Sequence, residues 1–276
     1  MTSEHFRPTS APTGAWPDPP PLPRPRIMDQ FWADAVFLHW RIPVAAAARY
    51  MPPGVEPDEI DGSTWVGLIG FRMVGAGLGQ GRPVPYLGSF TEINVRLYSR
   101  GPDGVRGVVF VTLDASRLAV VLAARAFGIN YVWSRCRPTG ENTGAVGGER
   151  FGYDVRRFRG GASSSFSVRP DRTAAAADPL SLELTARYGL HTGLGGRTLY
   201  VPNTHEPWRL FPATVVHLRD SLVAAAGFEV SGPPESVLFS PGVQTQFGRP
   251  AVPAAGPKRG RVPRTGKTLD AGWMPA

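Results

Sequence analysis

Hydrophobic and polar residues alternate most regularly between residues 90 and 98. Successive side chains of a β-strand point to opposite faces of a sheet, so a period of two predicts a strand with one apolar face and one polar face. The apolar positions, which are expected to pack in the core, are Ile93, Val95 and Leu97. The polar positions between and around them are Glu92, Asn94, Arg96 and Tyr98.

Further β-rich segments recur along most of the chain, separated by turn residues. They cover residues 36–42, 64–71, 108–113, 131–137, 150–158, 164–169, 213–218 and 237–239. Helices are expected at 45–50, at 116–127 with Asp114 as the N-cap, at 180–188 and at 220–226. The glycines at 75–81 predict a long flexible connection. Many strands and few helices predict an α+β fold, mainly antiparallel β, whose sheet closes or folds over to cover its edges.

The two ends of the chain differ in composition from its middle. Residues 1–26 contain eight prolines, and we interpret residues 1–30 as a disordered Pro-rich leader. Residues 31–250 are expected to form one domain. Residues 251–276 are interpreted as a disordered basic tail, with five basic residues against one acidic residue, so half of the net charge of +8 lies there. This distribution argues against a folded basic face that binds nucleic acid.

Several classes of site are excluded or unsupported. The single cysteine, Cys136, excludes an intramolecular disulfide and fits a reducing compartment. No run of 18 apolar residues or secretory signal is found, so we expect a cytoplasmic protein without membrane contact. The five histidines show no paired metal spacing, and neither a phosphate-binding loop nor a nucleophile elbow is present. The sequence therefore predicts no metal and no cofactor.

The best candidate site is the polar face formed by Glu92, Asn94 and Arg96. Two interpretations are open from the alternation alone. The three side chains either form a solvated outer face, or line a lumen where a carboxylate, an amide and a guanidinium meet a polar ligand. The same two interpretations apply to Tyr131, Trp133 and Arg135, which alternate with Val132, Ser134 and Cys136.

Several longer segments carry a resemblance to a known family. They include Phe37-Leu38-His39-Trp40-Arg41, Met51 to Asp58, Trp65-Val66-Gly67-Leu68, Thr91 to Arg96 and Leu238 to Val243. Together they resemble the YqjF-like family of uncharacterised proteins, domain of unknown function 2071, across residues 31–250. The resemblance implies a bacterial cytoplasmic protein with no assigned reaction. That family is in turn similar to acetoacetate decarboxylase, which implies a cone-shaped antiparallel β-barrel with a few flanking helices.

The catalytic pattern of the decarboxylase carries over only in part. Pro52-Pro53, Phe90-Thr91-Glu92 and Leu113-Asp114 match segments of that pattern. The lysine pair does not, because residues 128–132 read Gly-Ile-Asn-Tyr-Val and the first lysine of the chain is Lys258. A Schiff base requires a neutral primary amine, so decarboxylation by that route is not expected.

The resemblance favours a pocket at Glu92, in which Glu92 and Tyr131 are the candidate catalytic residues. Arg96 or Arg41 would pair with a ligand carboxylate, Asn94 would contact the ligand, and His205 and Glu206 would cap the mouth. We therefore expect a protein that binds a small acidic or carbonyl metabolite and, as an enzyme, acts on it by acid–base chemistry without a Schiff base. The alternatives are an interaction protein that acts through the leader and the tail, and an inert structural barrel. Whether the chain forms a homo-oligomer is open.

Overall fold

The computed structural model describes residues 18–79, 81–118, 121, 130–142 and 148–254. Strands dominate this part of the chain, which confirms the expected α+β class with mainly β structure. The helices described are α1 (Val44–Ala48), α3 (Pro179–Thr185) and α4 (Leu222–Ala225). The strands described are β1 (Met28–Ile42), β2 (Glu56–Pro57), β3 (Thr64–Leu78), β4 (Phe90–Arg100), β5 (Arg106–Ala115), β6 (Tyr131–Pro138), β7 (Glu141–Asn142), β8 (Glu149–Arg157), β9 (Ser163–Pro170), β10 (Gly189–Leu194), β11 (Arg197–His205), β12 (Phe211–Asp220) and β13 (Ser236–Phe247).

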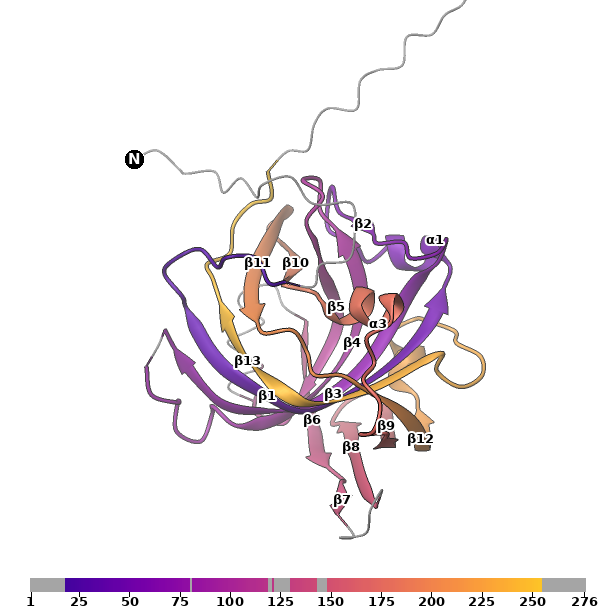
Figure 1. Ribbon diagram of the computed structural model, residues 1–276. Coiled ribbons are helices and arrows are strands. Elements are labelled where there is room, and N and C mark those ends of the chain that lie inside the picture. The colour runs from indigo at the N-terminus through magenta and orange to yellow at the C-terminus, as the bar shows by residue number, and fades with distance from the viewer. Residues whose placement is uncertain (1–17, 80, 119–120, 122–129, 143–147, 255–276) are drawn as a thin grey trace, which may run out of the picture.

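The sheet closes on itself twice. Pairing runs from β5 through β6, β8, β9, β12, β13, β1, β3 and β4 and returns to β5, which makes a ring of nine strands. A second ring uses the same β13, β1, β3, β4 and β5 and closes through β10 and β11. The five shared strands form a wall, with β8, β9 and β12 on one side and β10 and β11 on the other (Figure 1). The β5–β6 and β5–β10 pairs are parallel and the other described pairs are antiparallel, so the expected barrel is confirmed with two parallel contacts added.

The apolar face of the wall fills the nine-strand ring. Ile93, Val95 and Leu97 of β4 are fully buried there and pack in one cluster with Tyr153 of β8 and Phe166 of β9. This confirms the core face predicted from the alternation. Each fully buried side chain of this size contributes about 1.5–3 kcal/mol to folding. The space between these strands is therefore occupied by packed side chains.

The polar face of the wall is buried as well. Glu92 and Asn94 are each 2% exposed and Tyr98 is 0% exposed. On this side α3 and β10 cover the wall, and Tyr98 packs in one cluster with Leu184 and Leu190. The interpretation of this face as a solvated surface is therefore wrong for these residues. Because elements cover the wall on both sides, residues 91–99 of β4 are buried on both faces, apart from the half-buried Arg96.

Asp114 is not a helix N-cap. It lies inside β5 with no exposed surface, where its carboxylate accepts hydrogen bonds from Arg157 Nε at 2.8 Å and Ser134 Oγ at 2.7 Å. An ion pair from β8 holds this aspartate in the sheet, and local sequence does not report such a partner. Most of the helix expected at 116–127 lies outside the described residues.

The glycines at 75–81 do not form one long connection. Strand β3 continues through Gly75 and Gly77 because β1 pairs with it as far as Met28↔Leu78. Strand β1 begins at Met28, within the last residues of the expected leader. The leader before residue 18 and the tail beyond residue 254 lie outside the described residues.

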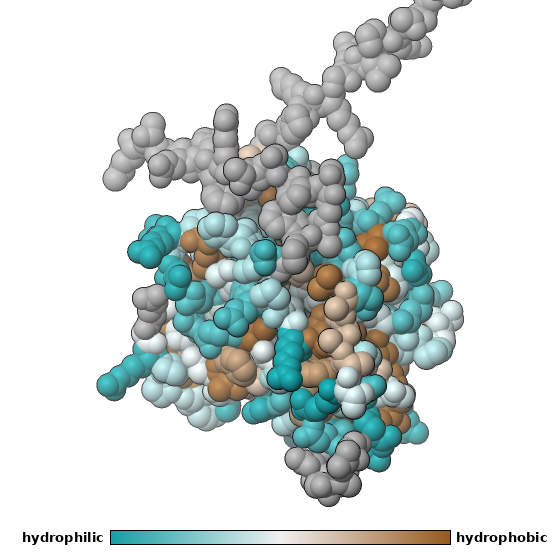
Figure 2. Space-filling view, viewed as in Figure 1, coloured by the Kyte–Doolittle hydropathy of each residue, from teal (hydrophilic) through white to brown (hydrophobic). Residues whose placement is uncertain are grey.

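The described surface mixes polar and apolar groups. Apolar side chains reach the face drawn in Figure 2 in several groups among hydrophilic ones. Within the described ranges, no helix is long and apolar enough to cross a bilayer.

Candidate functional site

Glu92 and Tyr131 meet on the polar face of the wall. Tyr131 Oη donates a hydrogen bond to Glu92 Oε2 at 2.7 Å, and Asn94 Nδ2 lies 3.4 Å from Glu92 Oε1 as a weaker donor. The sheet register explains the meeting. Leu113 of β5 pairs with Asn94 on one side and with Tyr131 on the other, so β4, β5 and β6 place Asn94 and Tyr131 in one row. The parallel β5–β6 pair therefore brings together residues 39 apart in the chain.

The environment of Glu92 shifts the pKa of its carboxyl group toward neutral pH. Burial raises the pKa of Glu92 to about 7, against the opposing effect of its hydrogen bonds from Tyr131 and Asn94. Burial, and then the charge of Glu92, raise the pKa of Tyr131 well above its ordinary value, so the phenol stays protonated and donates. A carboxyl group with a pKa near the working pH exchanges protons efficiently in either direction.

Arg96 lies on the same face of β4, two positions beyond Asn94. Its Nε donates to Tyr98 Oη at 3.2 Å and its Nη2 donates to the Leu184 backbone carbonyl at 3.2 Å. Among the described residues Arg96 forms no ion pair with a carboxylate. The cation is thus positioned by neutral oxygens and keeps its charge uncompensated.

His205 is buried against aromatic rings instead of standing at an open mouth. It is 4% exposed, and its ring centroid lies 4.9 Å from that of Tyr188, 5.2 Å from that of Trp208 and 6.0 Å from that of Trp32. Its Nδ1 lies 2.7 Å from the Glu206 backbone carbonyl, which identifies Nδ1 as the protonated nitrogen. Burial lowers the pKa of His205 to about 4, so the ring is neutral at pH 7.

Two expected site residues lie elsewhere. Arg41 is exposed, pairs with Glu235 at 3.0 Å and covers the Trp65 ring at 4.5 Å. The Glu206 side chain is exposed, and only its backbone carbonyl takes part, through His205. Arg41 sits one residue from the end of β1, at the rim of the wall, where its side chain is exposed.

The structure adds residues that sequence reasoning missed. His39 of β1 is fully buried, and its Nε2 lies 2.6 Å from Tyr98 Oη. Arg187, just after α3, is 5% exposed and stacks its guanidinium 5.0 Å from the Tyr98 ring centroid. His39 shares the alternation of Arg41 two residues later, which was a usable signal. Nothing in the sequence pattern indicated Arg187.

The enclosed side of the second ring carries several buried polar atoms without a hydrogen-bond partner in the described part of the chain. Such atoms are uncommon in folded proteins, and they are normally bonded by water or ligand when protein groups do not reach them. Near the polar face of the wall they are Trp32 Nε1, His39 Nδ1, Asn94 Oδ1, Arg187 Nη2 and His205 Nε2. This side of the wall therefore holds polar atoms whose hydrogen-bonding capacity is not used by the described protein groups.

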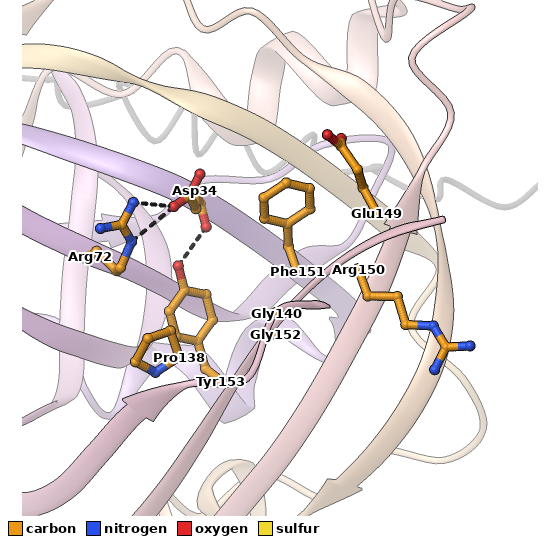
Figure 3. A pocket seen from close by; sticks show the side chains of 9 residues that line it. All are labelled: Asp34, Arg72, Pro138, Gly140, Glu149, Arg150, Phe151, Gly152 and Tyr153. Atoms are coloured by element: carbon orange, nitrogen blue, oxygen red, sulfur yellow. Dashed lines mark hydrogen bonds and ion pairs between the residues drawn. The ribbon is translucent and has the colours of Figure 1, made fainter. Parts of the chain in front are cut away.

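Two surface hollows are separate from Glu92. The larger, of about 340 Å³, lies beside β8, where Arg72 pairs with Asp34 and Tyr153 Oη donates to the Asp34 backbone carbonyl at 2.7 Å (Figure 3). The smaller, of about 140 Å³, is lined by His191 and Asn130 among others. Glu92 lines neither hollow, so the candidate site rests on the buried polar groups described above.

Comparisons with known proteins agree with this architecture. The family model of domain of unknown function 2071, described as an uncharacterised conserved protein, matches residues 29–244. The protein YqjF of Bacillus subtilis is 28% identical over 206 residues, which cover 73% of this chain and 78% of YqjF.

Solved structures with acetoacetate decarboxylase-like folds share the architecture at low identity. An acetoacetate decarboxylase-like enzyme of Sphingomonas wittichii aligns with a TM-score of 0.58 at 11% identity, over 84% of this chain and 94% of that chain. The enduracididine biosynthesis enzyme MppR in complex with pyruvate aligns with a TM-score of 0.56 at 16% identity, over 84% and 92%. An acetoacetate decarboxylase of Legionella pneumophila aligns with a TM-score of 0.55 at 14% identity, over 89% and 93%. The family match and the shared fold lead to one conclusion: this chain belongs to the family of domain of unknown function 2071.

Proposed function

We propose that the protein binds a small carbonyl compound or organic acid on the polar face of the wall and that Glu92 serves as its acid–base group. The observation that carries the proposal is the buried Glu92 carboxyl held by the Tyr131 hydroxyl at 2.7 Å. Burial places its pKa at about 7, so both protonation states are populated at neutral pH. MppR, which shares the fold, has been crystallised with pyruvate, a compound of this class.

The proposed step is reversible proton transfer at carbon. The Glu92 carboxylate removes a proton from the carbon next to the ligand carbonyl, the C–H electrons move into an enolate, and Glu92 becomes protonated. The phenol of Tyr131 donates its one proton to the Glu92 carboxylate and so holds this base in place. The only lysines of the chain, Lys258 and Lys267, lie outside the described residues, and the proposed step requires no amine.

Deuterium exchange tests this step. Pyruvate and 4-oxopentanoate are incubated with the protein in D2O at pH 7, and the loss of the α-proton signals is followed by ¹H NMR. We expect exchange faster than in buffer with the natural protein and with Glu229→Gln, whose carboxylate is exposed. Glu92→Gln should reduce exchange at least 100-fold, because an amide is not a base. Exchange at the buffer rate with the natural protein, or undiminished exchange with Glu92→Gln, would overturn the proposal.

Other expectations from the sequence stay predictions. An interaction function of the leader and the tail falls mostly on residues outside the described ranges. We also keep as predictions that the protein is cytoplasmic, that it can form a homo-oligomer and that it does not bind nucleic acid.

A further inference from the structure

Two guanidinium groups flank the Tyr98 ring. The Cζ atom of Arg96 lies 5.4 Å from the ring centroid, and that of Arg187 lies 5.0 Å from it. The two come from different elements, since Arg96 belongs to β4 and Arg187 follows α3. Arg96 also donates to the Tyr98 hydroxyl, so its position along the wall is fixed. Two cations around one buried ring form an electropositive region.

The carboxylates nearby do not balance these cations. Asp58 has no exposed surface and binds Arg187 at 2.5 Å and Arg106 at 2.7 Å. Glu183 pairs with Arg106 and lies 3.8 Å from Arg187 Nη2, beyond hydrogen-bond distance.

Among the buried and half-buried side chains of this cluster there are three guanidiniums and two carboxylates. These are Arg96, Arg106 and Arg187 against Asp58 and Glu183. One buried or half-buried positive charge is left over, and an uncompensated charge of this kind is costly.

Two hydrogen-bond donors in this region have no acceptor among the described residues. The first is Arg187 Nη2, whose side chain is 2% exposed. The second is His39 Nδ1. Tyr98 Oη accepts from Arg96 Nε, and we assign its one proton to His39 Nε2 at 2.6 Å, which leaves the proton of neutral His39 on Nδ1. Buried donors beside a surplus cation are suited to an anion.

Aromatic side chains pack close to these donors. The Arg96 guanidinium lies 5.6 Å from the Phe37 ring centroid, and Phe37 meets Trp208 edge-on at 5.2 Å. Trp208 in turn stacks on Trp32 at 5.9 Å. A ligand whose anionic end reaches Arg96 would lay an apolar body against these rings.

Glu92 lies at some distance from this region along the same strand. Arg96 lies four positions after Glu92 on β4, which corresponds to about 13 Å between their Cα atoms at ~3.3 Å per residue. The Arg96 side chain extends toward Tyr98, away from Glu92. A ligand that touches both groups is therefore extended, with its acid group and its carbonyl several bonds apart.

We propose that Arg96 and Arg187 bind the carboxylate of a monocarboxylic acid with an apolar chain, and that the far end of this acid reaches Glu92. This inference deepens the proposed function and rests on it for the role of Glu92. A single surplus positive charge matches one carboxylate better than a doubly charged phosphate. The apolar lining favours a hydrocarbon chain over a polar one.

Thermal unfolding with hexanoate and hexanamide tests the anion site. The two probes share a chain and differ in charge, and neither has the ketone on which Glu92 acts. We expect hexanoate, but neither hexanamide nor inorganic phosphate at equal ionic strength, to raise the melting temperature. Arg96→Gln should weaken hexanoate binding at least tenfold, while Arg156→Gln, a change at an exposed arginine of β8, should leave it unchanged. Arg96→Lys keeps the charge and should retain a preference for hexanoate over hexanamide.

The outcomes separate this inference from the function proposed above. The anion site would be overturned if hexanamide stabilises the protein as much as hexanoate, if hexanoate does not stabilise it, or if phosphate has a stronger effect. Full hexanoate binding by Arg96→Gln would overturn it as well. None of these results would affect Glu92-dependent exchange. If Arg96→Gln does not fold, a loss of the preference for hexanoate in Arg96→Lys would overturn it instead. Hexanoate binding with no exchange at Glu92 would retain the anion site and overturn the proton transfer.

Discussion

The Tyr131 hydroxyl donates to the Glu92 carboxylate at 2.7 Å across the neighbouring strands β4, β5 and β6. Tyr131 lies on β6, the first strand that belongs to the nine-strand ring alone, and Glu92 lies on β4, which both rings share. The contact therefore depends on the register of the parallel β5–β6 pair. The Glu92 carboxyl group is therefore both buried and hydrogen-bonded. Burial raises its pKa, and the hydrogen bond from Tyr131 limits that rise.

Glu92 should make folding stability fall as pH rises. Its pKa is about 7 in the folded protein and 4.5 in the unfolded chain, so between these values the folded state alone holds the proton. Stability is then greatest below pH 4.5 and declines by about 3 kcal/mol up to pH 7.

Glu92→Gln should remove this slope. Buried histidines contribute an opposite slope over the same range, because burial lowers the pKa of both His191 and His205 to about 4. The quantity to measure is therefore the difference in urea-unfolding free energy between the natural protein and Glu92→Gln at several pH values. A difference that does not change from pH 4.5 to pH 7 would contradict the raised pKa.

Tyr131→Phe should raise the pKa of Glu92 still further. The phenol stabilises the charged carboxylate, and phenylalanine keeps the ring without the donor. One hydrogen bond to a charged group corresponds to about 1 pKa unit or somewhat more. The pH dependence of α-proton exchange should move to higher pH by this amount. An unchanged profile would show that the hydroxyl does not act on Glu92.

Asp58→Asn should be among the more destabilising single changes at the covered side of the wall. Burial alone would raise the pKa of Asp58, but the guanidiniums of Arg187 and Arg106 outweigh it and hold the pKa at about 2. Loss of the carboxylate removes the shortest ion pair of the buried Arg187 and leaves Arg106 with Glu183 alone, at a cost of about 3–5 kcal/mol. Asp154→Asn is the matched control, because its partner Arg137 is 70% exposed and such pairs contribute about 0–1 kcal/mol. Urea unfolding at pH 7 measures both, and similar losses for the two variants would contradict this account.

Gly67→Ala should disturb the His39–Tyr98 contact directly. Gly67 pairs with His39 on one side and with Arg96 on the other. A Cβ at this position would lie 3.0 Å from His39 Cδ2, 3.2 Å from Tyr98 Oη and 2.6 Å from Ile69 Cδ1. Overpacking of this kind costs about 1–3 kcal/mol. We expect that loss in urea unfolding together with weaker hexanoate binding, and a variant as stable as the natural protein would contradict the close packing.

The sequence was informative about strands and faces and less so about depth and pairing. The alternation in β4 predicted both the core face and the candidate site face, because a strand has a period of two whatever surrounds it. It did not predict that both faces are buried, since that depends on β10, β11 and α3, which come at least 78 residues later. The family resemblance supplied the closed barrel, which local patterns indicated only in general terms.

Partners that lie far away along the chain explain where the structure differs from the predictions made from the sequence. Asp114 has the composition of a helix N-cap, yet an arginine 43 residues away binds it within the sheet. Arg41 shares a face with His39 but lies at the rim, where Glu235 binds it. Arg187 joins the site because α3 folds over the wall, and no periodic pattern in its own segment indicates this. Contacts of this kind depend on tertiary packing and are not encoded in a short window of sequence.

The most direct test of the central claim is a ¹³C NMR titration of the Glu92 carboxyl carbon. Protein labelled with [δ-¹³C]glutamate is titrated between pH 3 and pH 9, and Glu92→Gln identifies the resonance by its disappearance. We expect this carboxyl to titrate at about pH 7. A midpoint near 4.5, the ordinary value, would show that Glu92 is not the buried acid–base group described above.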